Sequence, residues 1–205
     1  MRNIKVGLLA CILMLPLAVH ADGISSLKKF YAETHAMRAD FHQLVTDQQG
    51  RKIQEVSGQM QLQRPNKFRW DYNKPFEQKI ISDGKQIWLY DIELAQVTVR
   101  ELSKALGSSP AALLAGEDNL EKNFQLIDAY HKDDLDWVST KPKDTDSGFN
   151  AISLAFKADQ LQEMDLTDSF GHQTKITFSK LERNPTIDGK AFSFKPPKGV
   201  DVVGE

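Results

Sequence analysis

The sequence predicts a mainly β protein in which antiparallel strands form one curved sheet or a partly closed barrel. Segments with alternating apolar and polar residues recur along most of the chain, as expected for strands with one buried face. Turn signals such as Asp83-Gly84 and Asp188-Gly189 separate these segments, so consecutive strands are expected to pair. Only two segments have a helical pattern. A sandwich of two sheets is the alternative, but it offers these helices no obvious place.

The first element, residues 1–21, has the form of a secretory signal peptide. Arg2 and Lys5 give it a basic start, an apolar run follows, and Ala21 is a suitable small-residue cleavage position. The apolar run is too short to span a membrane comfortably. We therefore expect export across the inner membrane, cleavage after Ala21 and a single domain over residues 22–205, which is 184 residues.

Cysteine content and charge exclude several classes of function. The only cysteine, Cys11, lies in the signal, so the mature chain is expected to have no disulfide, thiol nucleophile or cysteine-bound metal. Leu8-Leu9-Ala10-Cys11 also resembles a lipid-attachment site, and this alternative stays open, although the apolar run continues to Leu17. Without the signal, 24 basic and 28 acidic side chains remain, a net charge of −4. This argues against nucleic acid or an anionic lipid surface as the main partner.

The mature chain begins with a predicted helix at 24–37, where Ile24, Leu27 and Phe30 recur at helical spacing. Strands are then predicted near 41–45 and at 53–64, 67–73, 79–82, 85–90 and 95–100. After a second helix the alternation returns at 124–126, near Trp137, and at 152–156, 164–166, 174–178 and 192–194. The two helical segments therefore interrupt a series of short strands.

The second helix is predicted at 110–115. Ser109-Pro110 is typical of a helix cap and first position, and Gly116 is typical of a stop. Leu113, Leu114 and their neighbours make it apolar all round, so it either belongs to the core or covers an apolar surface. The pattern alone leaves both possibilities open.

A charge interrupts the apolar face of the strand at 53–64. Val56, Gly58, Met60 and Leu62 occupy the even positions, and Arg64 follows in the same register. A guanidinium on an apolar surface is unfavourable unless its donors are satisfied, so Arg64 either reaches water at the strand end or fastens a neighbouring polar group. Large rings then follow on the next strands: Phe68, Trp70, Tyr72, Trp88 and Tyr90. Aromatic residues on strands usually belong to the core.

No pattern of catalytic or metal-binding residues stands out. His35, His42, His131 and His172 show no metal-ligand spacing and adjoin no nucleophile motif. Asp144-x-Asp146-x-Gly148 is a fragment of a calcium loop without the closing glutamate, so we expect a plain turn. The acidic run at 133–136 is expected to be a solvated turn. We expect no enzyme, no catalytic residue, no metal and no cofactor.

Several segments together resemble the family of LolA, the periplasmic outer-membrane lipoprotein carrier protein. The matching segments are Gly58 to Leu62, Arg64-Pro65-Asn66-Lys67-Phe68-Arg69-Trp70, Ile81-Ser82-Asp83-Gly84-Lys85, Ile87-Trp88-Leu89-Tyr90, Ser109-Pro110 with Leu113-Leu114, and Phe192 to Val200. They occur in the same order and cover essentially the whole mature chain, with a looser match over about 117–150. The resemblance implies a strongly curved antiparallel sheet that forms an incomplete barrel, with short helices as a lid over an apolar cavity.

The resemblance also implies a function: a periplasmic chaperone that accepts triacylated lipoproteins from an inner-membrane ABC transporter and delivers them to the outer-membrane receptor LolB. Exposing one acyl chain of about sixteen carbons to water costs on the order of 12 kcal/mol, so aqueous transfer needs a carrier. A monomer is expected. Two alternatives stay open, a carrier of another lipid or glycolipid on the same scaffold and the receptor itself, although a receptor would begin its mature chain with a lipid-bearing cysteine.

The resemblance implies roles for particular residues. Arg64 would lock the lid by hydrogen bonds to carbonyls of the lid helix, which would contain Leu113, Leu114 and Ala115. The acyl-binding cavity and its mouth would be formed by Met60, Leu62, Phe68, Trp70, Trp88 and Tyr90. The resemblance therefore gives the guanidinium of Arg64 an expected partner, the carbonyls of the helix at 110–115.

Overall fold

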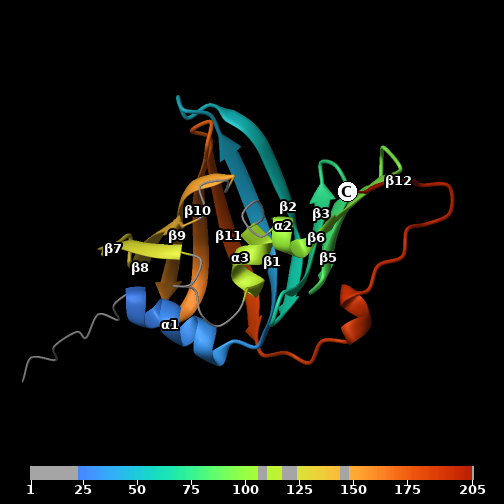
Figure 1. The fold of residues 1–205 in the computed structure, drawn as a ribbon. Coiled ribbons are helices and arrows are strands. Elements are labelled where there is room, and N and C mark those ends of the chain that lie inside the picture. Colours follow the sequence, from blue (N-terminus) through green and yellow to red (C-terminus); the bar gives the residue numbers. More distant parts are fainter. Residues whose placement is uncertain (1–22, 106–109, 117–123, 144–147, 205) are drawn as a thin grey trace, which may run out of the picture.

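The computed structural model describes residues 23–105, 110–116, 124–143 and 148–204. The strands in these residues form one sheet in the order β12-β6-β5-β4-β3-β2-β1-β11-β10-β9-β8-β7 (Figure 1). Neighbouring strands pair antiparallel, except that β12 pairs with β6 in parallel. The predicted mainly β fold with one antiparallel sheet and few short helices is confirmed.

The bounds of the elements are as follows. The helices are α1 (Gly23–Glu33), α2 (Leu102–Ala105), α3 (Pro110–Ala115) and the 3-10 helix η2 (Gly189–Phe192). The strands are β1 (Ala36–Thr46), β2 (Lys52–Gln63), β3 (Lys67–Lys74), β4 (Gln78–Asp83), β5 (Gln86–Asp91), β6 (Gln96–Glu101), β7 (Phe124–Lys132), β8 (Leu135–Pro142), β9 (Phe149–Lys157), β10 (Gln160–Asp168), β11 (Gln173–Arg183) and β12 (Asp201–Gly204).

The sheet grows outward from β1. Strands β1 to β6 follow one another on one side, and β7 to β11 return so that β11 pairs with the other edge of β1. The two end strands, β12 and β7, are not paired with each other, so the described sheet is open and not a closed barrel. Figure 1 shows α2 and α3 over one face of the sheet, between its two flanks, and α1 across one end of the strands.

The main core lies on the face that the helices cover. Period-two alternation puts Met37, Ala39 and Phe41 of β1 on this face, each at most 3% exposed. At Gly58 of β2 a side chain would collide with the backbone of Asp71 and with the ring of Phe41, so glycine lets the ring lie close over the strand. We call this side of the sheet the covered face.

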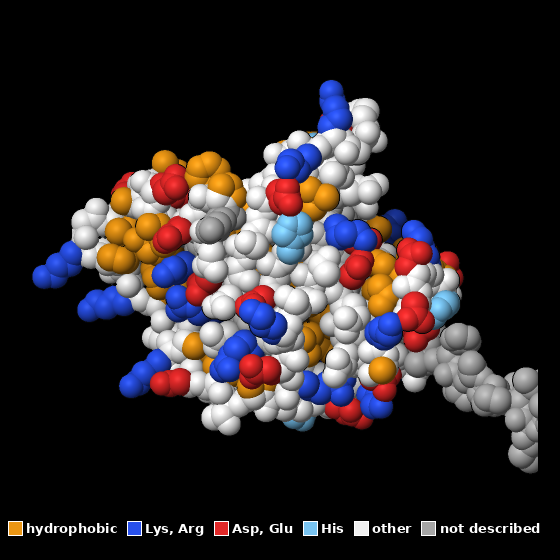
Figure 2. Space-filling model, turned by 180° about the vertical axis from the view of Figure 1, so that it is seen from behind, with side chains coloured by type: hydrophobic (Ala, Val, Ile, Leu, Met, Phe, Trp, Pro, Cys, Tyr) orange, Lys and Arg blue, Asp and Glu red, His pale blue; other side chains and the backbone are white. Residues whose placement is uncertain are grey.

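A second, smaller core lies on the opposite face. It contains Ile81, Trp88 and Val97, and Phe194 and Val200 of the C-terminal segment pack against it. Figure 2, the view from behind, shows charged side chains spread over this side of the molecule, with hydrophobic side chains in separate patches. We call the side that carries the smaller core the rear face.

Three details differ from the predicted elements. The first helix ends at Glu33 and not at 37, because the side-chain amide oxygen of Asn184 accepts from the backbone N–H groups of His35 and Ala36 and the chain enters β1. The predicted strand at 192–194 is wrong. Phe192 ends η2, and the chain reaches the sheet only at β12. The strand β12 and the helix α2 had no prediction.

Some predictions lie outside the described residues. These are the signal peptide at 1–21 with Cys11 and the cleavage position Ala21, the Ser109 cap, and the aspartates of the turn at 144–148. In the part of the chain that is described, no helix is long and apolar enough to cross a membrane.

Candidate functional site

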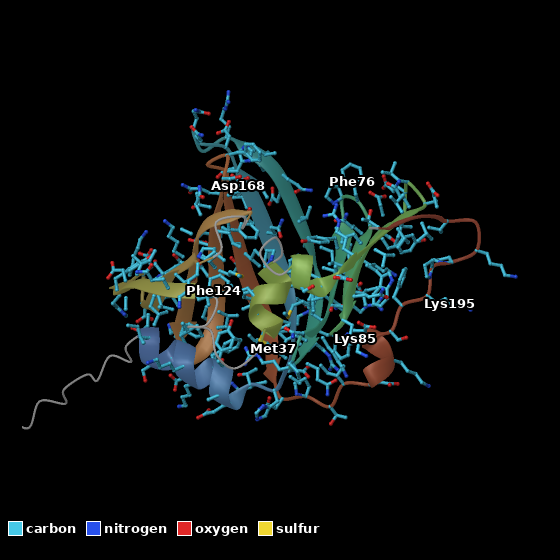
Figure 3. All side chains as sticks on the ribbon, viewed as in Figure 1. Met37, Phe76, Lys85, Phe124, Asp168 and Lys195 are labelled. Atoms are coloured by element: carbon cyan, nitrogen blue, oxygen red, sulfur yellow. The ribbon has the colours of Figure 1, made fainter. Side chains whose placement is uncertain are left out.

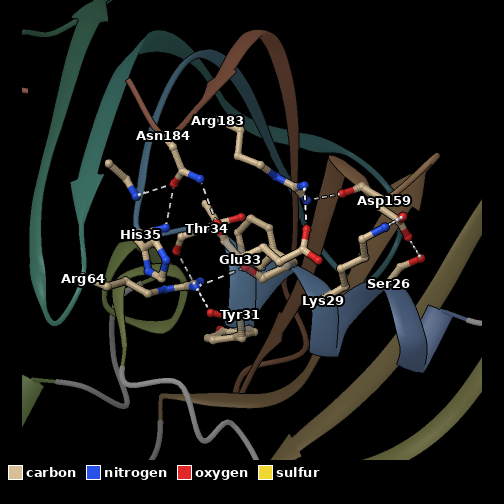
Figure 4. A network of polar contacts seen from close by, with 12 residues as sticks. Ser26, Lys29, Tyr31, Glu33, Thr34, His35, Arg64, Asp159, Arg183 and Asn184 are labelled. Carbon is tan, nitrogen blue, oxygen red and sulfur yellow. Dashed lines mark hydrogen bonds and ion pairs between the residues drawn. The ribbon is translucent and has the colours of Figure 1, made fainter. Parts of the chain in front are cut away.

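Arg64 lies directly after β2 and joins the ends of two helices. Its Nη1 donates to the carbonyls of Phe30, Tyr31 and Thr34, at 3.2, 2.9 and 2.8 Å. Its Nε and Nη2 donate to the carbonyl of Leu114 in α3, at 3.3 and 2.9 Å. Figure 4 shows the contacts to the end of α1. The guanidinium that follows the apolar register of β2 therefore has backbone carbonyls of two helix ends as its partners.

The position of Arg64 is electrostatically favourable for both helices. Neither α1 nor α3 has a basic residue of its own in its last turn. The carbonyls at a helix C-terminus carry partial negative charge and lack donors within the helix. Because Arg64 reaches both ends at once, one side chain from the sheet supplies the missing donors and the positive charge to two helices.

Tyr31 of α1 makes a second contact with α3. Its hydroxyl donates to the carbonyl of Leu113 at 2.8 Å, and the guanidinium carbon of Arg64 lies 4.2 Å from its ring centroid. Burial raises the pKa of Tyr31 to about 12, although the charge of Arg64 opposes this shift. The phenol is therefore protonated at neutral pH and can donate to the carbonyl, which only accepts.

The turn between β2 and β3 supplies a third contact. Asn66 has a positive φ of 64°, and its backbone N–H donates to the carbonyl of Ala115 at 2.7 Å. The last three carbonyls of α3, at residues 113–115, thus accept hydrogen bonds from three residues, one in α1 and two in the turn after β2. We call the groups of Tyr31, Arg64 and Asn66 that hold these carbonyls the clasp. α3 has only six residues, and the carbonyls at its C-terminus find their hydrogen-bond donors mainly in this clasp.

α1 is attached to the sheet by polar contacts of its own (Figure 4). Lys29 pairs with Asp159 in the turn between β9 and β10, and Arg183 of β11 donates to the carbonyl of Asp159 and reaches Glu33. The side-chain amide of Asn184 donates to the carbonyl of Glu33. α1 is therefore fixed to the second half of the sheet independently of α3.

Beneath α3 the covered face is apolar and closely packed. Met60, Leu62, Phe68 and Trp70 are at most 1% exposed, and Leu113, Leu114 and Ala115 are at most 5% exposed in the same core. α3 packs against β2 and β3. Figure 3 shows the side chains of the described residues, with Met37 of the covered face labelled. The structure thus brings together seven of the predicted site residues, with Arg64 at their edge.

Trp88 and Tyr90 lie elsewhere. Both point to the rear face, where their ring centroids are 6.2 and 5.6 Å from that of Phe194. The residue between them, Leu89, packs against the main core instead. The structure therefore does not bring these two rings together with Phe68 and Trp70, because strand residues alternate between faces.

The described residues contain no group of three or more His, Cys, Asp or Glu side chains that could hold a metal ion. Three of the histidines pair with single carboxylates at the surface: His42 with Glu55, His131 with Asp136 and His172 with Asp168.

A family model described as "Outer membrane lipoprotein carrier protein LolA" matches residues 32–195. The chain belongs to the LolA family. It is 56% identical over its whole length to the outer-membrane lipoprotein carrier protein of Methylobacillus flagellatus, which is also covered completely. With that of Dechloromonas aromatica it shares 47% identity over 98% of this chain and 97% of the relative. The LolA family consists of carriers of outer-membrane lipoproteins and not of enzymes.

Solved structures share the fold at low identity. A conserved protein of Thermus thermophilus matches with a TM-score of 0.53 and 14% identity, over 89% of this chain and 97% of the other. A LolA superfamily protein of Nitrosomonas europaea matches with a TM-score of 0.50 and 12% identity, over 85% and 99%. These two likenesses concern the fold alone.

Two members of the clasp were not predicted from the sequence. Tyr31 belongs to the apolar stripe of its helix, so its spacing indicated only a core ring, and its hydroxyl partner lies 82 residues away. Asn66 acts through its backbone N–H, which no side-chain pattern reveals. The one available signal is the Pro65-Asn66 pair, which is typical of a turn and indicates no contact with the helix.

Proposed function

We propose that the protein binds the acyl chains of outer-membrane lipoproteins on the covered face beneath α3. In this proposal it works in the periplasm after cleavage behind Ala21, as a monomer. It accepts triacylated lipoproteins from an inner-membrane ABC transporter and delivers them to the outer-membrane receptor LolB. Membership in the LolA family supports the cargo, and the large apolar face supports burial of its acyl chains.

In the same proposal, the open sheet is the wall of an incomplete barrel, and α3 is its lid. The observation that carries this is the clasp, in which hydrogen bonds from outside α3 hold its last three carbonyls. Each hydrogen bond to a charged group contributes about 1.5–3 kcal/mol, so the few bonds of the clasp together contribute less than the gain from burying an acyl chain, on the order of 12 kcal/mol. Such hydrogen bonds can hold α3 over the covered face of the empty protein, and binding of cargo can still displace α3.

Met60, Leu62, Phe68 and Trp70 are the proposed acyl-binding residues on the sheet, and Leu113, Leu114 and Ala115 are those of the lid. Trp88 and Tyr90 are left out, because they pack under the C-terminal segment on the rear face. Acyl chains beneath α3 would not reach them without passing through the sheet.

Substitution Arg64→Leu tests the lid. Loss of the guanidinium destabilises the closed empty state, so the affinity for acylated cargo should rise by about tenfold or more. Onward transfer should slow, because bound cargo has less to gain by leaving. The measurements are the affinity for a fluorescent palmitoylated lipopeptide and the rate of its transfer to acceptor liposomes.

Arg38→Leu is the matched control, because Arg38 makes an exposed ion pair with Glu182 and contacts no lid carbonyl. It should leave both quantities unchanged, and circular dichroism should show that both variants fold. A folded Arg64→Leu protein with wild-type affinity and transfer rate would exclude the proposed lock. Mass spectrometry of lipids that co-purify from the periplasm distinguishes lipoprotein cargo from a glycolipid.

A further inference from the structure

Trp70 carries an unpaired hydrogen-bond donor in the middle of the covered face. Its side chain is 1% exposed, and its indole Nε1 is buried without a hydrogen-bond partner among the described residues. An indole N–H can only donate. Buried polar groups are almost always paired, and leaving one unpaired is unfavourable for the state that contains it. The empty closed protein is therefore a state in which this group lacks its partner.

The neighbours of Trp70 are mostly rings. Its centroid lies 4.7 Å from that of Phe41 and 6.3 Å from that of Phe178. The next residue of β3 on the same face is Tyr72, and among the described residues its hydroxyl makes one long hydrogen bond, of 3.4 Å, to the side-chain oxygen of Gln43. Burial raises the pKa of Tyr72 to about 12, so its hydroxyl stays protonated. The covered face thus contains a few polar groups, those of Trp70, Tyr72 and Gln43, whose hydrogen bonds to one another are absent or long.

We propose that the Nε1–H of Trp70 binds a carbonyl oxygen of the acyl linkage in the cargo. This rests on the proposed function. The strongest hydrogen-bond acceptor at the head of a saturated acyl chain is the carbonyl oxygen of its ester or amide, and a carbonyl is the complement of an indole donor. Because the donor is unpaired in the empty protein, the hydrogen bond to cargo forms without breaking a hydrogen bond within the protein. Trp70 therefore recognises acyl esters and amides, in addition to the apolar chains that the surrounding rings bury.

Trp137 provides a contrast within the same chain. Its Nε1 is also buried without a partner among the described residues, but its ring stacks on Tyr130 at 6.1 Å and an interplanar angle of 3°. Trp137 lies outside the main core, whereas its neighbour Val138 is part of it. Acyl chains on the covered face would not meet the ring of Trp137. The two indoles therefore have the same chemistry and different access to cargo.

The test compares two lipopeptides that differ only in the linkage. One carries a cysteine with two ester-linked hexadecanoyl chains on its glyceryl group, and the other carries the ether-linked hexadecyl analogue without these carbonyls. The wild-type protein should bind the ester about 3- to 10-fold more tightly. Trp70→Phe should remove most of this preference, whereas the matched control Trp137→Phe should keep it.

A second measurement does not depend on the stability of a variant. In the wild-type protein labelled with ¹⁵N, the indole N–H resonance of Trp70 should shift on binding the ester and shift clearly less with the ether. Equal binding of the two lipopeptides by the wild type, or the same preference in Trp70→Phe, would overturn the inference and leave the proposed function standing. If the wild type bound neither lipopeptide, the proposed function itself would fail.

Discussion

The two faces of strands β3 to β5 carry large aromatic residues, yet their covers differ. On the covered face, Phe68 and Trp70 lie under α3, whose last carbonyls are held by the clasp. On the rear face, Trp88 and Tyr90 lie under an extended C-terminal segment that includes Phe194. Aromatic content alone therefore does not indicate which face binds cargo. Our proposal that cargo binds on the covered face rests on the nature of the cover.

The covers also differ in how they are attached. The C-terminal segment continues into β12, which adds a parallel backbone ladder to β6 over Asp201–Gly204. α3 has no ladder with the sheet. Among the described residues, the clasp holds the C-terminus of α3, and apolar side chains pack against the rest of the helix. A cover attached in this way can be displaced without unpairing any strand, which supports our proposal that the protein opens on the covered face.

The largest expected effect separates the two faces directly. Phe68→Ala and Trp88→Ala each remove a buried ring, so each should lower the free energy of unfolding by about 3–5 kcal/mol in urea titrations. Only Phe68→Ala should also weaken binding of a palmitoylated lipopeptide, because only Phe68 lies beneath α3. Weaker binding in a folded Trp88→Ala protein, with Phe68→Ala unaffected, would reverse our assignment of the faces.

A smaller effect is expected from Tyr31→Phe. It removes one hydroxyl and leaves the carbonyl of Leu113 without this donor, so the free energy of unfolding should fall by about 1 kcal/mol. Because the closed empty state is weakened, lipopeptide affinity should rise about 3- to 10-fold, in the same direction as for Arg64→Leu. The control is Tyr90→Phe on the rear face, which should leave the affinity unchanged. A similar change in both variants would show that the clasp is not the cause.

The smallest effect concerns the attachment of α1. The hydrogen bond from Lys29 holds the pKa of Asp159 below its ordinary value of 3.8, although burial opposes the shift. A carboxyl whose folded pKa is lowered stabilises the protein above its unfolded pKa and loses this contribution as pH falls through the folded value. Asp159→Asn should therefore lower stability slightly at pH 7, and the difference from wild type should shrink toward pH 3.

Urea titrations at the two pH values check this expectation, with lipopeptide affinity as a second readout. The affinity should be unchanged at pH 7, because Asp159 holds α1 and contacts no carbonyl of α3. A difference in stability that grows as the pH falls would contradict the assignment of this ion pair.

Strand patterns were the most predictable part of the fold. The alternation in β2, β3 and β5 and the Asp83-Gly84 turn follow from local chemistry, and the structure contains these elements close to their predicted bounds. The segment at 192–194 was mispredicted as a strand because alternating phenylalanines are also compatible with an irregular segment. In such a segment the two rings can pack at different places. Phe192 ends a 3-10 turn, and Phe194 covers Trp88.

Local periodicity and motifs along the chain were enough to predict most of the strands, the family and the unusual charge at Arg64. Which rings share a face, and which donors meet the carbonyls of α3, became visible only once the chain was folded. Trp70 and Trp88 are both tryptophans on short strands of the same sheet. Only the pairing register and the covering segments show that they lie on opposite faces. The clasp joins groups from residues 31 to 115, and contacts at such separation are fixed by packing of the whole chain.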